Sequence, residues 1–207
     1  MSLIIRKANK NDSKFLLDLK NDADALKNSL INKAVSKSEH TAWYEKKLQD
    51  HGTKIFIFEN DFKKKVGFVR FDQDKSNTTA NVSIAISKEF RGKRYAQRML
   101  QQGIKEISKI QPLVFLATVK ADNESSLRAF KSSGFGVEEN NKKLIKLSNK
   151  QTIIDAIEMV RNRNNINWMN LLRLAFKTSP NDAGEIMGKI NSDDTEISKL
   201  LGLLSKK

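Results

Sequence analysis

Apolar and polar residues follow two regular periods in the middle of the chain. Val82, Ile84 and Ile86 alternate with small residues, which is the period of a strand. A helical period begins after Tyr95, where every third or fourth residue has an apolar side chain. The apolar positions of that face are Ala96, Met99, Leu100, Ile104 and Ile107. We therefore expect a buried strand, a short turn and an amphipathic helix between residues 82 and 107.

The rest of the first 148 residues can be divided in the same way. The expected strands are 3–8, 54–59, 65–72, 79–87, 113–119 and 142–147. The expected helices are one capped by Asn11 and Asp12, a short one before Ser29, one at 36–48 capped by Ser36 or Ser38, and those at 95–107 and 123–135. This order of elements predicts an α/β (α+β) fold, in which a central mixed, mostly antiparallel sheet is flanked by helices.

Residues 150–207 follow a different pattern and are predicted to form a helical extension to a first domain at 1–149. The expected helical segments are 152–163, 168–177, 181–190 and 194–204, and Pro180 suits the first turn of the third. The spacing of the apolar residues Ile197, Leu200, Leu201 and Leu204 predicts a face that needs a partner. Three partners stay open: a second copy of the chain in a homodimer, another protein of the same pathway, or the first domain of the same chain.

Charge narrows the kind of partner to expect. The formal net charge is +14, from 38 Lys and Arg residues against 24 Asp and Glu residues. Basic and acidic residues nearly balance within 151–207, so the excess positive charge lies before that segment. A basic domain favours an anionic partner such as a nucleic acid, a nucleotide or CoA, and the alternative is a lysine-rich solvated surface. Nucleic acid ranks last because the helical extension is close to neutral.

The composition also excludes several kinds of site. The chain has no Cys, which excludes disulfides, thiolate catalysis and metal sites with Cys ligands. With His40 and His51 as its two histidines, it is not expected to bind a metal. No apolar run is long enough to span a membrane, and the first residues lack the core of a signal peptide. We therefore expect a cytoplasmic protein with no membrane partner.

The turn before the predicted helix at 95–107 is a candidate phosphate site. Backbone N–H groups at a helix N-terminus are unpaired, and the helix dipole attracts anions there. Arg91, Lys93 and Arg94 add positive charge, and Gly92 permits a backbone shape that other residues resist. The alternative interpretation is a basic surface loop in contact with solvent.

Two motifs in order resemble the signatures of one family. Arg91-Gly92-Lys93-Arg94-Tyr95-Ala96 resembles the acetyl-CoA pyrophosphate loop of the GNAT N-acetyltransferase superfamily, (Q/R)-x-x-G-x-(G/A), except that Arg94 replaces the usual Gly. Asn123, Ser126, Phe130 and Gly134-Phe135 resemble the second signature, N-x-x-(S/A)-x-x-x-(Y/F)-x-x-x-G-F. Two ordered signatures are more specific than either alone. The resemblance covers residues 3–148 and implies the GNAT fold.

The resemblance also implies how acetyl-CoA is held. Pantetheine would pair with the strand backbone at Ile84, Ala85 and Ile86, where this strand separates from the one that begins at Leu113. Asn123 would bond the amide arm of the cofactor, and Phe130 would pack beside the thioester. The loop residues that would hold the pyrophosphate are Arg91, Gly92, Lys93, Arg94, Tyr95, Ala96 and Gln97. The implied reaction is direct attack of an amine on the thioester, without a covalent enzyme intermediate.

The usual proton-handling residues of the family are replaced. Many relatives have a Glu base at the start of the central strand, and the matching position here is Asn81, which can orient water but cannot accept a proton. Phe130 stands where many relatives have a Tyr acid. His40 is the remaining candidate base, because an imidazole titrates near neutral pH, and the alternative for His40 is a surface helix residue. Proximity of the two substrates can supply much of the rate.

A second resemblance suggests an acceptor. Glu39-His40-x-x-Trp43-Tyr44 and Val66 to Asp72 resemble N-acetyltransferases of nonulosonic (pseudaminic-type) acid pathways, which acetylate the 4-amino group of a UDP-linked amino sugar. The acceptor residues that this implies are His40, Trp43, Arg70 and Asp72. Two other functions stay open: acetylation of a protein N-terminus or Lys, and a GNAT-shaped binding module without turnover. An acceptor peptide favours an acidic groove, whereas this chain is basic.

Overall fold

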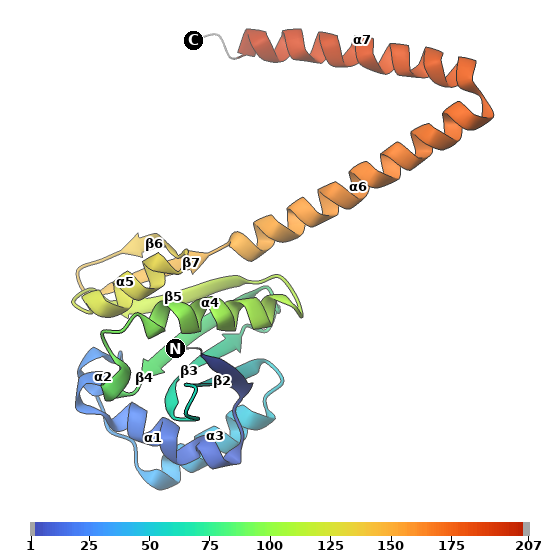
Figure 1. Cartoon of the computed structure of the whole chain (residues 1–207). Helices are drawn as coiled ribbons and strands as arrows, with labels where there is room; N and C mark the ends of the chain where they lie inside the picture. The colour runs from blue at the N-terminus through green and yellow to red at the C-terminus, as the bar shows by residue number, and fades with distance from the viewer. Residues whose placement is uncertain (1–2, 205–207) are drawn as a thin grey trace. The chain divides into compact units, whose positions relative to one another are not determined.

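The computed structural model describes residues 3–204 of the chain (Figure 1). The chain divides into two compact units, residues 1–155 and residues 156–207, and the boundary falls inside a helix. The first unit contains the sheet and all the predicted cofactor and acceptor residues. The second unit is helical throughout its described residues, apart from one connecting residue. The site can therefore be described from the first unit alone.

Seven strands form one sheet within residues 3–155, in the order β1-β2-β3-β4-β5-β7-β6. The strands are β1 (Ile4–Lys7), β2 (Thr53–Glu59), β3 (Lys65–Gln73), β4 (Thr79–Ile86), β5 (Val114–Lys120), β6 (Gly136–Asn140) and β7 (Leu144–Asn149). Neighbouring strands are antiparallel except for β4 and β5, which are parallel. The expected mixed, mostly antiparallel sheet is confirmed.

The sequence prediction missed one strand, β6. This strand pairs only with β7, at the edge of the sheet, and each of its five residues is exposed. Its sequence contains a single large apolar residue, Val137. A strand that buries neither face has no alternation of apolar and polar residues, so periodicity could not identify it.

Helices cover both faces of the sheet. They are α1 (Ser13–Asn21), α2 (Ala23–Asn28), α3 (Lys37–Gln49), α4 (Tyr95–Ser108) and α5 (Glu124–Ser132), with 3-10 turns at Lys10–Asp12 and Lys88–Phe90. On one face, Leu16 of α1 and Tyr44 of α3 pack with Ile55 and Ile57. The intervening Phe56 points to the opposite face, where α4 and α5 enclose the larger core. Figure 1 shows α1 and α3 lying together on the side of the sheet away from α4.

The N-terminal caps agree only in part with expectation. Ser36 caps α3 in a capping box with Glu39, which decides between the two predicted serines. Asp12 precedes α1, but its side chain makes no capping hydrogen bond to that helix. Its buried carboxylate instead lies 2.7 Å from the Arg6 guanidinium and 2.7 Å from Lys65 Nζ. Asp12 is thus the N-cap residue of α1, as predicted, but its side chain does not cap the helix because the carboxylate is bound by Arg6, Lys65 and the Asn9 N–H, and Asn11 lies in the preceding 3-10 turn.

The C-terminal segment contains two long helices, not the four that were predicted. They are α6 (Gln151–Thr178) and α7 (Pro180–Leu204), joined by Ser179, and Pro180 begins α7 as expected. The segments 164–167, which is rich in Asn, and 191–193 contain neither Gly nor Pro, so nothing in them interrupts the backbone hydrogen bonds of the helix. Ile197, Leu200 and Leu201 are 53%, 55% and 58% exposed, and the side chain of Leu204 lies outside the described residues. None of the described helices is long and apolar enough to cross a membrane.

Candidate active site

The centre of the sheet opens between β4 and β5. Their pairing is limited to Thr79 with Val114, Ala80 with Phe115 and Asn81 with Leu116. Beyond these pairs β4 continues to Ile86 beside β3 alone, while β5 continues to Lys120 beside β7 alone. The two strands therefore separate after Asn81, as the resemblance implied.

Backbone groups of β4 face this opening at alternate residues. Ser87 N donates to Val66 O at 2.9 Å and Asp74 N donates to Thr79 O at 3.0 Å, so odd-numbered residues of β4 pair with β3. Ladder hydrogen bonds alternate in direction along an antiparallel strand, so Ile84 and Ile86 turn their backbone groups toward the opening. The Ala85 backbone faces Phe68 of β3 instead. Of the three residues predicted to pair with pantetheine, two have their backbone groups at the opening.

The predicted phosphate loop has two left-handed residues. Gly92 has φ +75° and Arg94 has φ +59°. Arg94 is the N-cap of α4 and makes no side-chain capping hydrogen bond, so the first-turn N–H groups of α4 are not capped by a side chain. Arg94 thus adopts a backbone shape for which Gly is favoured, and its exposed side chain has no partner among residues 3–204. The Gly-to-Arg departure from the family motif therefore leaves the loop conformation intact.

Arg91 holds the loop against α2. Its guanidinium donates to Asp22 at 2.7 Å and to Asp24 at 2.8 Å, and its Nε donates to Ile86 O at 3.0 Å. Burial alone would raise the pKa of Asp22, but the hydrogen bond from Arg91 helps to lower it overall. The Arg91 side chain is thus committed to protein groups, and it also occupies the carbonyl of Ile86. Sequence reasoning did not identify Asp24.

The other predicted loop residues also use their side chains within the protein. Lys93 Nζ donates to Glu89 O at 2.9 Å, and the buried ring of Tyr95 meets Phe90 edge-on at 5.8 Å. Gln97 Nε2 donates to Ser132 O at 2.9 Å, which links α4 to α5. These residues and Ala96 can therefore serve a phosphate chiefly through backbone N–H groups at the start of α4.

The second signature lies at α5. Asn123 is buried and caps this helix, because its Oδ1 accepts from Ser126 N at 3.1 Å and from Ser125 Oγ at 3.0 Å. Its Nδ2 has no partner among the described residues and stays available as a donor. Phe130 is 4% exposed and packs edge-on against Phe135 at 5.0 Å. A phenyl ring has no proton to give, so it cannot protonate the leaving thiolate.

Three of the predicted acceptor residues lie together on the α1/α3 face of the sheet. The Arg70 guanidinium lies 5.1 Å from the centroid of the Trp43 ring. Its Nε donates to Asp72 Oδ2 at 2.7 Å, and its Nη2 donates to Ser83 Oγ at 3.3 Å. Because Ser83 lies just beyond the last paired residue of β4, this group stands beside the opening.

Further polar residues that the sequence did not indicate complete the group. Lys47 Nζ and Thr53 Oγ1 donate to Asp72 Oδ1 at 2.7 Å and 3.0 Å. Burial alone would raise the pKa of Asp72, but the charge of Arg70 and the hydrogen bonds from Lys47 and Thr53 lower it overall. Burial lowers the pKa of Lys20, and the charge of Arg70 lowers it further. We call Lys20, Trp43, Lys47, Arg70, Asp72 and Ser83 the Arg70 cluster.

The two candidate catalytic residues have different surroundings. His40 is 4% exposed, and its Nε2 must carry a proton because it lies 3.0 Å from the Ser13 carbonyl oxygen. Burial lowers the pKa of His40, although this hydrogen bond opposes the shift. The His40 ring also lies 5.4 Å from that of Trp43.

Asn81, the second candidate, is exposed. It pairs with Asp72 of β3 and belongs to the last residue pair between β4 and β5. Both catalytic assignments stay predictions, and a base role for His40 would have to use Nδ1.

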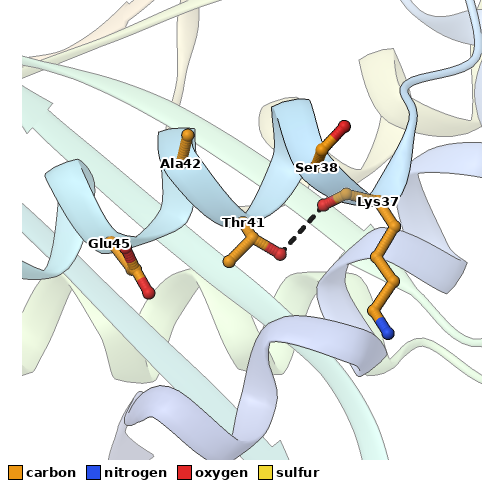
Figure 2. A pocket seen from close by; sticks show the side chains of 5 residues that line it. All are labelled: Lys37, Ser38, Thr41, Ala42 and Glu45. Atoms are coloured by element: carbon orange, nitrogen blue, oxygen red, sulfur yellow. Dashed lines mark hydrogen bonds between the residues drawn. The ribbon is translucent and has the colours of Figure 1, made fainter.

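A recess on α3 lies apart from these groups. It has a volume of about 620 Å³ and is lined by Lys37, Ser38, Thr41, Ala42 and Glu45 (Figure 2). Thr41 Oγ1 donates to Lys37 O at 2.9 Å, so this hydroxyl is used within the helix. Ser38, Ala42 and Glu45 of this recess are exposed, whereas His40 and Tyr44 are buried. The recess thus contains none of the predicted acceptor residues.

Comparison with known proteins identifies the fold. Residues 2–136 match the family model described as "Acetyltransferase (GNAT) domain". No curated protein sequence matches the chain. The solved spermidine N-acetyltransferase from Vibrio cholerae, in complex with CoA and spermine, is similar at 20% identity and a TM-score of 0.64, covering 70% of this chain and 94% of that chain. A structure assigned as a phosphinothricin N-acetyltransferase is similar at 20% identity and a TM-score of 0.62, covering 72% and 98%. The predicted GNAT fold is confirmed.

Proposed function

The chain belongs to the GNAT family of acetyltransferases, which transfer acetyl from acetyl-CoA to amines, and we propose that its acceptor is an anionic small molecule. The favoured acceptor is a nucleotide-linked amino sugar, acetylated at its 4-amino group. This proposal combines the sequence resemblance to nonulosonic acid enzymes with the charge of the Arg70 cluster.

The position of Arg70 is the observation that carries the proposal. Its guanidinium is held by Trp43, Asp72 and Ser83, which leaves Nη1 without a hydrogen-bond partner among the described residues. A fixed guanidinium beside an aromatic ring suits the phosphate and base of a nucleotide. The cluster contains three positive charges, on Lys20, Lys47 and Arg70. They outnumber the nearby carboxylates of Asp72 and of Asp50, which lies 3.7 Å from Lys47. Such a site attracts an anion and repels a polyamine.

The residues present also fit acetyl-CoA. The backbone groups of Ile84 and the N–H of Ile86 face the opening, while the Ile86 carbonyl accepts from Arg91, and the N–H groups at the start of α4 have no side-chain cap. Arg94 supplies an unpaired charge at that helix end, and Asn123 Nδ2 supplies a donor for an amide carbonyl. When bound, acetyl-CoA provides the thioester carbon that the amine attacks and the thiolate that leaves. The chain's own groups position the two reactants beside Ser83.

The proton of the attacking amine needs a route out of the site. The amine nitrogen forms a bond to the carbonyl carbon, the C–S bond breaks, and one amine proton is released. Asn81 cannot accept that proton, but its exposed amide can hold a water that does. Phe130 offers no acid, so the thiolate takes its proton from water. The proposal therefore relies on positioning more than on a side-chain acid or base.

An acceptor comparison tests the proposal. The full chain is supplied with acetyl-CoA and with one of three acceptors: a UDP-linked 4-amino sugar, the same amino sugar without the nucleotide, or spermidine. Release of free thiol is measured with each acceptor. We expect turnover with the UDP-linked sugar, a much higher KM for the free sugar, and little turnover of spermidine.

Calorimetry with acetyl-CoA separates the two ways in which the test can fail. If acetyl-CoA binds but spermidine has the highest kcat/KM, the anionic acceptor is wrong and the polyamine reaction named for the Vibrio cholerae neighbour applies here. If acetyl-CoA does not bind at micromolar concentrations, the chain is a GNAT-shaped binding module without turnover. The proposed acetyl transfer is then wrong, whatever the acceptor.

A further inference from the structure

The two C-terminal helices carry large apolar side chains that are left exposed within the second unit. Trp168 is 60% exposed, Leu171 is 57% exposed and Ile197 is 53% exposed. The other large apolar residues exposed in the second unit are Ile157, Met159, Val160, Ile166, Met169, Leu174, Phe176, Ile186, Ile190, Leu200 and Leu201. An amphipathic helix buries such a face against another element, and large exposed apolar patches mark interaction surfaces.

Both helices have the seam of a coiled coil. Spacings of three and four residues lead through Ile157, Arg161, Asn164, Trp168, Leu171 and Ala175 in α6. The same spacings lead through Ala183, Met187, Ile190, Asp194, Ile197 and Leu201 in α7. Each seam is apolar except near its middle, where α6 is basic or amide and α7 is acidic. The two faces are therefore suited to each other.

The two seams match in antiparallel register around Ser179. Residues at equal distances before and after Ser179 are then opposite one another. The opposed pairs are Ala175 with Ala183, Leu171 with Met187, Trp168 with Ile190, Asn164 with Asp194, Arg161 with Ile197 and Ile157 with Leu201. In this register the run with Arg161 and Arg163 lies beside the run with Asp193, Asp194 and Glu196. Four of the six opposed pairs are thus apolar, Asn164 meets Asp194, and Arg161, opposite Ile197, lies one helical turn from Asp194.

The connection between α6 and α7 is too short for one chain to make this pairing with itself. Antiparallel helix hairpins have loops of two to five residues, whereas Ser179 alone separates these helices. Ser179 N donates to Ala175 O at 2.8 Å, and Ala183 N donates to Ser179 O at 3.0 Å. The Ser179 Oγ also donates to Asp182 at 2.5 Å. Ser179 therefore belongs to the hydrogen bonding of both helices and leaves no free loop residue.

We propose that α6 of one chain pairs with α7 of a second copy, and the reverse, around a two-fold axis that passes near Ser179. A two-fold axis near Ser179 produces this register directly. A residue of α6 in one copy then meets the residue of α7 in the other copy that is the same number of positions from Ser179. The occupant of the apolar face is thus another copy of this chain. Asp194 fixes the register, since a shift by one heptad would place Leu171 or Ile157 opposite its carboxylate instead of Asn164.

The mass of the full chain in solution is the first measurement. The chain has a mass of 23.5 kDa, so light scattering should give about 47 kDa, twice that value. Leu171→Glu places a charge in the seam and should yield a monomer. Arg173→Glu changes the opposite side of the same helix and should leave the dimer intact. A monomeric parent chain, or a Leu171→Glu chain that stays dimeric, overturns the proposal.

Disulfide cross-linking tests the register. The chain has no Cys of its own, so only the introduced cysteines can form a disulfide. The variant Asn164→Cys with Asp194→Cys should oxidise to a disulfide-linked dimer on a non-reducing gel. The control pairs Asn164→Cys with Ser192→Cys, which points away from the seam, and should remain uncross-linked. A disulfide formed within one chain overturns the proposal in favour of a hairpin, and equal cross-linking of both variants overturns the register.

Discussion

The Arg70 guanidinium lies over the Trp43 ring, 5.1 Å from its centroid, and so joins α3 to the sheet beside the opening between β4 and β5. Trp43 and Arg70 are 27 positions apart in the sequence, and each would be an ordinary surface residue in isolation. This contact and the hydrogen bond from Arg70 Nε to Asp72 fix the guanidinium at the site that we propose for the acceptor.

Arg70→Gln tests whether this group binds the acceptor. Removing a charge-assisted hydrogen bond to a phosphate costs about 1.5–3 kcal/mol, so KM for the UDP-linked acceptor should rise roughly 10- to 100-fold. KM for acetyl-CoA should not change. The matched control is Arg128→Gln, which removes an exposed guanidinium from α5. An equal rise in both KM values would indicate a general disturbance of the sheet.

Arg94→Gly tests both the backbone strain at position 94 and the contribution of the Arg94 side chain to acetyl-CoA binding. Gly adopts φ +59° without the strain that a side chain adds, so the variant should be more stable by about 1 kcal/mol in urea unfolding. Its affinity for acetyl-CoA should fall several-fold, because an unpaired charge near the pyrophosphate is lost. Gly92→Ala is the companion variant, and it should be destabilised at φ +75°. Tighter binding after Arg94→Gly would show that the Arg94 side chain obstructs the cofactor.

Asp12→Asn tests the ion pairs that the buried Asp12 carboxylate makes with Arg6 and Lys65, whose side chains are each 31% exposed. Losing these charge-assisted hydrogen bonds should cost about 1.5–3 kcal/mol of stability at pH 7. Burial alone would raise the pKa of Asp12, but hydrogen bonds from Arg6 and Lys65 hold it well below its usual range. The unfolded chain therefore takes up the proton first as pH falls, and the contribution is lost progressively below about pH 4. Urea unfolding at pH 7 and pH 3 should show the difference from wild type shrinking. Asp18→Asn, an exposed change in α1, should have little effect at either pH.

His40→Gln separates structure from catalysis. The variant should lose about 1–3 kcal/mol of stability, since the imidazole bonds the Ser13 carbonyl, stacks on the Tyr44 ring and contacts the tilted Trp43 ring. Burial lowers the pKa of His40, so its contribution is complete above about pH 6.5 and declines as pH falls below that value. If Nδ1 also accepts the amine proton, kcat should fall at least 100-fold and its acidic limb should disappear. An unchanged pH profile of kcat would restrict His40 to linking α3 with α1. His51→Gln, an exposed change, is the control.

Local periodicity predicted the elements that bury one face. The helix expected at 95–107 is α4, Tyr95–Ser108, because its apolar residues recur at helical spacing over the core. The same reasoning missed β6, which buries nothing, and divided α6 and α7 at polar runs that carry no helix-breaking residue. Periodicity reports burial, so it identifies poorly those elements that lie at an edge or outside the core.

The partners of the site residues could not be predicted in this way. Arg91 reaches Asp22 across 69 positions, and Lys47 reaches Asp72 across 25. These contacts depend on which strands and helices become neighbours, and no local pattern contains that information. The family motif identified the loop at 91–97, but only the structure shows that Arg91 is committed to α2 while Arg94 is not.

The short pairing between β4 and β5 should also make the stability of the fold depend on bound acetyl-CoA. Three residue pairs join the strands β1–β4 to the strands β5–β7, and the Ile84 and Ile86 amides beyond them lack a neighbouring strand. A ligand that bonds those amides adds free energy to the native state alone, by an amount that grows with the logarithm of its concentration. Resistance to unfolding and to proteolysis should therefore rise and fall with the supply of acetyl-CoA, so the substrate pool itself sets how long each enzyme molecule lasts.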